Sequence, residues 1–142
     1  MATFTKYQIF VQELGRKSHN LHTDQLAIAL SNTAPNVATH ALLADVTEIS
    51  TANGYTSSAG TLLLTGISYA HTAGVGKLVA TDCVVTASGG TVGPFRYVIL
   101  YNATATGDML IGSWDRGASL TLQDGESFTT DFDATNGILT IT

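Results

Sequence analysis

The stretch Phe95-Arg96-Tyr97-Val98-Ile99-Leu100-Tyr101-Asn102 decides the fold class of this chain. Aromatic and β-branched residues dominate it, and such residues favour β-strands. Gly89-Gly90 precedes the stretch and Thr106-Gly107-Asp108 follows it, and glycine-rich pairs of this kind favour turns. The sequence therefore predicts a strand over residues 95–102.

Outward from this strand, apolar and β-branched runs recur from Thr61 to the end, separated by Gly, Asn and Asp. Asp124-Gly125 and Asn136-Gly137 suit tight turns, because these residues accept a positive φ. The expected strands are 25–30, 61–69, 77–86, 95–102, 109–114, 119–122, 127–132 and 138–141. This spacing predicts one mainly β domain over residues 1–142, a β-sandwich or jelly-roll-like fold.

Two segments differ from the rest of the chain. Phe4, Tyr7, Phe10, Val11 and Leu14 fall at helical spacing, so we expect one N-terminal helix over about residues 4–14. In strand 25–30 the large residues alternate with alanines, and the large ones are expected to face the core. Residues 31–60 are expected to form an irregular connection, a kind of segment that often carries contacts.

Composition and charge exclude several functions. Only 12% of the 142 residues are charged, and the formal net charge is −5. The six Lys and Arg are scattered, so nucleic-acid binding has no basic surface to rest on. No apolar run approaches the roughly 20 residues of a membrane helix. The N-terminus lacks the order of a secretory signal, so synthesis in the cytoplasm is expected.

Two local features resemble reactive sites and favour ordinary structural interpretations. Cys83 is the single cysteine and lies among apolar neighbours, which indicates a buried, inert thiol. Gly74-Val75-Gly76-Lys77 resembles the end of a phosphate-binding loop, but Leu78 follows it and no helix does. A hairpin turn is the preferred interpretation.

The histidines and carboxylates give no convincing metal site. His19, His22, His40 and His71 lack an accompanying Cys pair or His-Glu signature, so no metal or other cofactor is expected.

An acidic group near the C-terminus comprises Asp124, Glu126, Asp131 and Asp133. Calcium ligands can have such spacing. Within a strand, however, Phe128 and Phe132 would share the inner face, and Asp131 and Asp133 would be solvated. We prefer this second interpretation.

No nucleophile elbow or motif-placed Ser, His and Asp is present, so an enzyme is not expected. A small hydrolase that uses the acidic group ranks last among the functions considered, and loss of turnover on Asp131→Asn would be its test.

Arg96 and Trp114 are the side chains of greatest interest. A buried Arg96 needs a carboxylate or carbonyl partner, for which Asp115 and Asp131 are candidates. Trp114 is expected to be a core lid or an interface anchor.

Several segments together resemble a group of small tailed-bacteriophage virion proteins. The likeness covers most of the chain and rests on residues 4–7, 26–35, 93–102, 110–115, 120–122, 124–128 and 137–141. The resemblance implies a structural role, most like a capsid decoration (cement) protein. Such proteins are β-rich and oligomeric, and they bind the outside of the capsid shell between subunits.

The resulting expectation is a virion protein, made in the host cytoplasm, that forms homo-oligomers and binds the major capsid protein or another virion protein. The alternative is a tail, neck or receptor-binding component, in which exposed Tyr55, Tyr69 and Trp114 stack on sugars. The interface residues expected from the sequence are Phe4, Tyr7, Phe10, Tyr55 and Trp114.

Overall fold

Layers of β-strands form the framework of the molecule. The computed structural model describes residues 2–58 and 62–142. Strands account for 44% of it and helices for 8%, which confirms the mainly β class and a β-sandwich-like domain with one N-terminal helix. The elements are β1 (Phe4–Lys6), α1 (Gln8–Gly15), β2 (Leu26–Ser31), the 3-10 helix η1 (Leu43–Asp45), β3 (Leu62–Leu63), β4 (Ser68–Thr72), β5 (Val75–Val79), β6 (Cys83–Thr86), β7 (Val92–Asn102), β8 (Met109–Leu122), β9 (Ser127–Thr130) and β10 (Leu139–Ile141).

The central layer is a five-stranded antiparallel sheet in the order β1-β8-β7-β2-β3. All six residues of β2 are buried, so both faces of the sheet are covered. Leu26, Ile28 and Leu30 pack into the larger core, as expected from their alternation. Ala27 and Ala29 pack into a second, smaller core on the opposite face, where small side chains let another layer approach closely.

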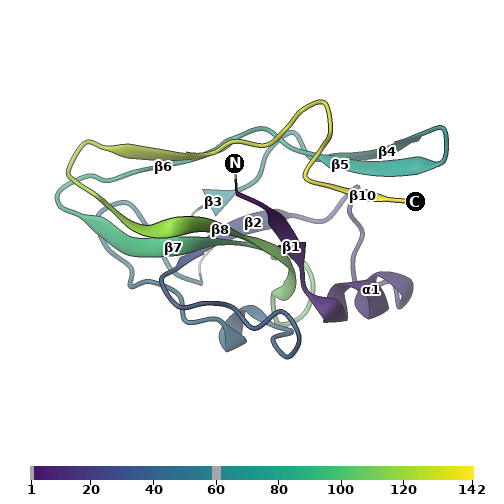
Figure 1. Cartoon of the computed structure of the whole chain (residues 1–142), viewed down its shortest axis with the longest axis horizontal. Coiled ribbons are helices and arrows are strands. Elements are labelled where there is room, and N and C mark those ends of the chain that lie inside the picture. The colour runs from purple at the N-terminus through teal and green to yellow at the C-terminus, as the bar shows by residue number, and fades with distance from the viewer. Residues whose placement is uncertain (1, 59–61) are drawn as a thin grey trace.

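Two smaller sheets, β10-β5-β4 and β6-β9, form the layer above the larger core (Figure 1). β5 continues into β6, and the one strand expected over residues 77–86 is interrupted at residues 80–82. There the N–H of Thr81 donates to the carbonyl of Thr65. Leu78 and Val85 from this layer join the core residues of the central sheet. Cys83 is also buried, and burial raises the pKa of its thiol to about 11, so it is not poised as a nucleophile.

The irregular connection covers the other face of the central sheet (Figure 1). Its described residues, 32–58, contain η1 and no named strand, and residues 59–60 of the expected segment lie outside the described part. Leu43 and Val46 pack with Ile99 and Tyr101 in the smaller core. This segment therefore works as part of the protein's own core, as well as presenting an outer surface.

The N-terminal helix begins later than its apolar spacing predicted. Phe4 lies in β1, opposite Trp114 of β8, and not in the helix. Tyr7 keeps an extended backbone (φ −70°, ψ 144°), and its N–H donates to the carbonyl of Ile111. The helical spacing was misleading here because pairing with β8 satisfies this backbone instead.

β8 is one strand of 14 residues where two were expected. Asp115-Arg116-Gly117 is not a turn between strands but a bulge within one. Tyr97 faces Asp115 and Phe95 faces Leu120, so two steps along β7 match five along β8. Other expected boundaries also shift: residues 61–69 divide into β3 and β4, with Thr61 outside the described residues, and β9 ends at Thr130.

The segment that resembled a phosphate-binding loop is a hairpin, as preferred from the sequence. Ala73 and Gly74 form the turn between β4 and β5, both with positive φ. Among the described residues, no helix has the length and apolar character needed to cross a membrane.

Candidate functional site

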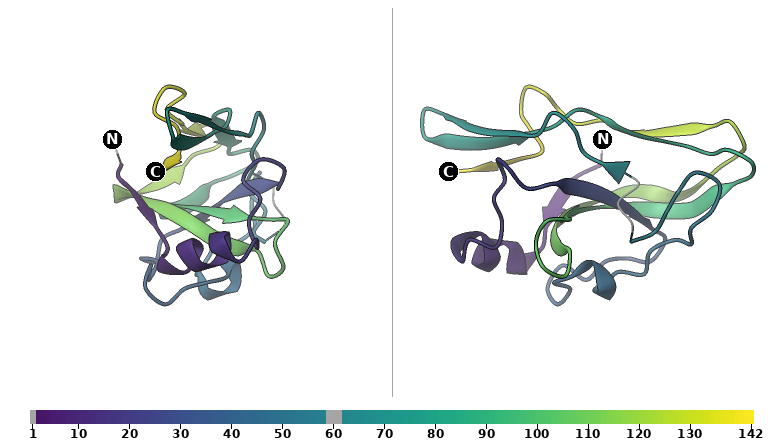
Figure 2. Two further views of the ribbon diagram at one scale, coloured as in Figure 1. Left: turned by 90° about the vertical axis from the view of Figure 1, so that its right-hand side faces the viewer. Right: turned by 180° about the vertical axis from the view of Figure 1, so that it is seen from behind.

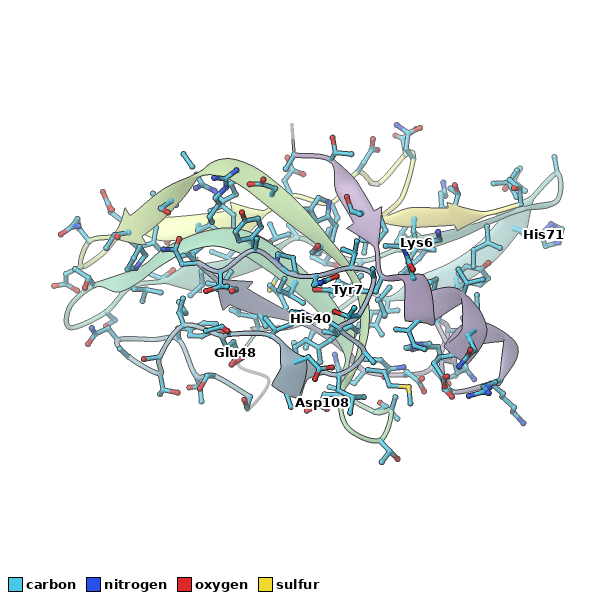
Figure 3. All side chains as sticks on the ribbon, turned by 60° about the horizontal axis from the view of Figure 1, so that its bottom comes forward. Lys6, Tyr7, His40, Glu48, His71 and Asp108 are labelled. Atoms are coloured by element: carbon cyan, nitrogen blue, oxygen red, sulfur yellow. The ribbon has the colours of Figure 1, made fainter. Side chains whose placement is uncertain are left out.

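The four histidines do not converge on one point. His19 is buried, and its Nδ1 lies 3.1 Å from Nδ2 of Asn102, which donates to it. His40 and His71 lie far apart in Figure 3. Across residues 2–58 and 62–142, no three His, Cys, Asp or Glu side chains are grouped so as to hold a metal ion.

The acidic residues near the C-terminus mostly hold turns. Asp124 accepts the N–H of Gly89 at 2.8 Å, and Glu126 accepts the N–H of Gln123 at 2.7 Å. Asp133 accepts the N–H groups of Thr135 and Asn136, which lowers the pKa of Asp133 below its ordinary value. These contacts explain the carboxylates structurally, without a catalytic pair.

Asp131 is exposed, as expected. Phe132 is buried and Phe128 is half-buried, and both pack toward the larger core. The shared inner face of these two rings is therefore confirmed.

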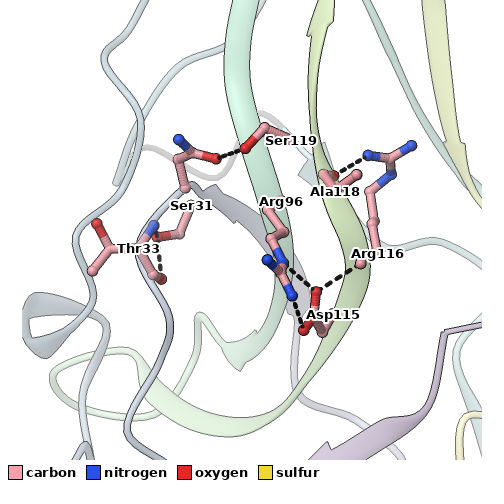
Figure 4. Close-up of polar contacts among 9 residues, drawn as sticks. Ser31, Thr33, Arg96, Asp115, Arg116, Ala118 and Ser119 are labelled. Carbon is pink, nitrogen blue, oxygen red and sulfur yellow. Dashed lines mark hydrogen bonds and ion pairs between the residues drawn. The ribbon is translucent and has the colours of Figure 1, made fainter.

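Arg96 pairs with Asp115, one of its two candidate partners, and is only half-buried. Its Nε and Nη2 donate to the two carboxylate oxygens of Asp115 at 2.7 and 2.9 Å (Figure 4). The two side chains are 38% and 47% exposed, because residue 96 of β7 faces outward while Phe95 faces inward. The guanidinium and the N–H of Gly117 lower the pKa of Asp115 to about 2.

One side of the sandwich is open. β1 is the edge of the central sheet there, and β9 and β10 are edges of the two smaller sheets, with no strand of the described chain paired to their outer sides. Contacts between β3 and β6 close the opposite side. Figure 2 shows both chain ends near the open side. We define the open side as β1, β8 from Trp114 onward, β9, β10 and the side of α1 that faces β10.

A hollow of about 670 Å³ lies between β8 and β9 on the open side, and we call it the aromatic groove. Phe4, Trp114, Phe128 and Phe132 are among its lining residues. The ring of Trp114 lies 5.0 Å from that of Phe4 and 5.9 Å from that of Phe132. Aromatic contacts at these distances stabilise a groove whose shape is already formed.

A second hollow, of about 550 Å³, lies between α1 and β10, and we call it the helix groove. Phe4 lines both hollows, so they adjoin each other. Val11 and Leu14 of α1 form one wall, and Leu139 and Ile141 of β10 form the other. Val11 is 57% exposed, the highest value among the large apolar residues found exposed.

Arg116 is the cation of the aromatic groove. Its guanidinium lies 5.4 Å from the ring centroid of Phe128 and 5.9 Å from that of Phe95. One N–H donates to the carbonyl of Ala118 at 2.8 Å (Figure 4). No carboxylate of the described chain pairs with it, since Asp115 pairs with Arg96. The two rings and the carbonyl fix Arg116 in place and leave most of its five donors free.

The five expected interface residues separate into two sets. Phe4 and Trp114 line the open side, and Phe10 reaches it at the base of the helix groove, although it is only 3% exposed. Tyr7 and Tyr55 are 0% and 2% exposed. Their place in an interface is corrected here: the backbone of Tyr7 is extended and its side chain enters the smaller core, and the Tyr55 hydroxyl accepts the N–H of Leu30. Tyr55 is thus also removed from the exposed aromatics expected to stack on sugars.

Sequence reasoning missed Arg116 and the β10 residues Leu139 and Ile141. Arg116 falls between the expected strands 109–114 and 119–122, and no local signal shows that a bulge turns it toward Phe128. β10 was predicted, but its place opposite α1 depends on long-range pairing with β5.

Comparison with known proteins adds no relative: no family model matches the chain, and neither the curated proteins nor the solved structures give a significant match.

Proposed function

We propose that this protein is a structural virion component that binds the outside of a phage capsid and stabilises the shell. The open side carries the proposal, because it joins two grooves that contain aromatic and aliphatic side chains with three strand edges that are unpaired within the described chain. Such a face suits binding to another protein: the grooves accept apolar side chains, and the strand edges supply main-chain hydrogen bonds.

The sequence resemblance supports the same role. It implies a decoration protein, a class that binds the outside of the capsid shell between subunits. A surface with few charges is compatible with this, because charged residues are depleted from the centres of protein interfaces. The homo-oligomer expected for this class is part of the proposal.

The test mixes the purified protein with undecorated capsids of its phage. We expect the protein to bind and the shells to survive at a higher temperature, because a ligand that binds only the assembled state stabilises that state. Absence of both effects would contradict the proposal.

Two valine substitutions connect this test to the open side. Val11→Asp places a charge in the helix groove, and we expect it to weaken capsid binding at least about tenfold, because binding would remove the new carboxylate from water among mainly apolar side chains. Val84→Asp is the matched control, since Val84 is similarly exposed, at 52%, but lies on the outer face of β6. Equal binding by the two variants would remove the helix groove from the interface.

A tail, neck or receptor-binding component is the second candidate. A pre-formed groove with Trp114 at its wall and Arg116 inside it also suits a small ligand such as an acidic sugar. Localising the protein in images of intact virions distinguishes the candidates: density over the capsid shell supports decoration, and density at the tail or neck supports the alternative.

A further inference from the structure

We propose that the aromatic groove binds an extended segment of a partner protein, which adds to β9 as a further strand and places an acidic side chain against Arg116. The partner under the proposed function is another virion protein. The inference about the groove itself rests on β9, Arg116 and Phe128.

The free edge of β9 is the place where a further strand can pair. Its four residues, Ser127–Thr130, pair on one side with β6, and no backbone hydrogen bond of the described chain uses the other side. An exposed strand edge with unpaired N–H and C=O groups is a template for another strand. Here that edge borders the aromatic groove, so an added strand would also bury apolar surface.

Arg116 determines which charge the partner segment should carry. It is a half-buried cation in the groove with no carboxylate partner in the described chain. Asp115, its neighbour, is already paired with Arg96 through both oxygens and does not compete. An arginine with a free planar fork favours a carboxylate, which it can bind through two parallel hydrogen bonds.

The register follows from β9 itself. In an antiparallel pair, the residue directly opposite Phe128 would have its Cβ about 4.5–5.5 Å from that of Phe128, on the same face. Arg116 lies over the ring of Phe128 on that face. An Asp or Glu opposite Phe128 would therefore meet the guanidinium. Two residues away, opposite Thr130, an apolar residue would enter the groove beside Phe132 and Trp114.

The aromatic packing favours a peptide over a sugar in this groove. Trp114 is already in contact with the rings of both Phe4 and Phe132, which leaves less of its surface for stacking on a sugar ring. A sugar stacked on the aromatic rings would leave the unpaired backbone N–H and C=O groups of β9 without partners. A peptide strand would form hydrogen bonds with these groups.

The experiment uses the full chain, labelled with nitrogen-15, and two synthetic heptapeptides, acetyl-TVTETLT-amide and acetyl-TVTQTLT-amide. We expect the Glu peptide to shift the amide signals of residues 116–117 and 127–130. We expect its Kd to be at least about tenfold lower than that of the Gln peptide, because only the carboxylate forms charge-assisted hydrogen bonds with Arg116. Equal affinities, shifts confined to other regions, or no binding by either peptide would overturn the proposal.

Substitutions of Arg116 make the assignment specific. Arg116→Gln should abolish the difference between the two peptides, and Arg116→Lys should retain part of it, because lysine keeps the charge without the planar fork. Arg16→Gln, at the residue that follows α1, is the control and should leave the preference unchanged. If Arg116→Gln does not fold, the comparison of the two peptides on the native chain decides alone.

Two further outcomes separate this inference from its alternatives. Free galacturonic acid that shifts the same amides, without peptide binding, would overturn the strand proposal in favour of an acidic sugar. Peptide binding together with failure to bind capsids would contradict the proposed virion role and leave the groove assignment standing.

Discussion

The hydrogen bonds of Asp115 determine the state of Arg116, the next residue, in the aromatic groove. Its carboxylate accepts two hydrogen bonds from Arg96 and one, at 2.7 Å, from the N–H of Gly117. The carboxylate thus holds the backbone of the bulge next to Arg116 and removes itself as a partner for that cation. The free charge of Arg116 is therefore a consequence of the pairing between Asp115 and Arg96.

The pKa of Asp115 gives a direct test of this arrangement. We expect an NMR titration to place it near 2, and Arg96→Gln to raise it toward the ordinary value of 3.8 without reaching it, because the Gly117 N–H still donates. Since the folded-state pKa is depressed, the contribution to stability is present above the unfolded value and is lost as pH falls toward 2. Arg116→Gln is the control and should leave the Asp115 pKa near 2; an equal rise in both variants would contradict the assigned partner.

At the scale of elements, the local sequence pattern predicted the strands whose own residues strongly favour extended structure. It failed where pairing with a distant strand determines the structure. The alternation in β2 and the run in β7 predicted both strands to within a few residues. The helical spacing of Phe4 and Tyr7 was misleading, because both residues pair with β8 through the backbone. Phe4 and Trp114 of the open side were anticipated as contact residues, whereas Arg116 was not, because its position depends on a bulge that only the register of β7 and β8 shows.

Two glycines at neighbouring irregularities in the pairing of β7 with β8 provide a pair of substitutions to compare. Gly117 has a φ of +87° and open space around it, whereas Gly93 has a φ of +118° and a Cβ there would lie 2.7 Å from the carbonyl oxygen of Leu120. We expect Gly117→Ala to cost about 1–2 kcal/mol, from backbone conformation alone. Gly93→Ala should cost about 3 kcal/mol or more, because a clash with backbone is added. Urea unfolding measures both, and equal losses would show that the register described for β7 and β8 is wrong.

At the scale of the whole molecule, the central sheet is covered on both faces, and this places several ionisable groups inside. Tyr55 and Cys83 lie in the larger core, and Tyr7 and Tyr101 lie in the smaller one. Burial raises the pKa of Tyr7 and of Tyr101 to about 12, and it also raises the pKa of Tyr55. The stability of both cores should therefore depend on pH in the alkaline range, because each core contains at least one of these three phenols.

The sign of that dependence predicts cooperative unfolding in alkali. Each phenol keeps its proton in the folded state and loses it near pH 10 when unfolded, so its contribution is complete below pH 10 and falls above it. For Tyr7 and Tyr101 the contribution is lost as pH rises toward 12. Three phenols together lower the free energy of unfolding by up to about 4 kcal/mol per pH unit in that window. We expect the increase in tyrosinate absorbance from these residues to coincide with loss of the β signal in circular dichroism. Tyr101→Phe removes one of the three groups, so it should make the loss of stability with pH less steep. Ionisation of all the tyrosines while the β signal remains intact would show that both faces of the central sheet admit solvent, contrary to the layered packing described here.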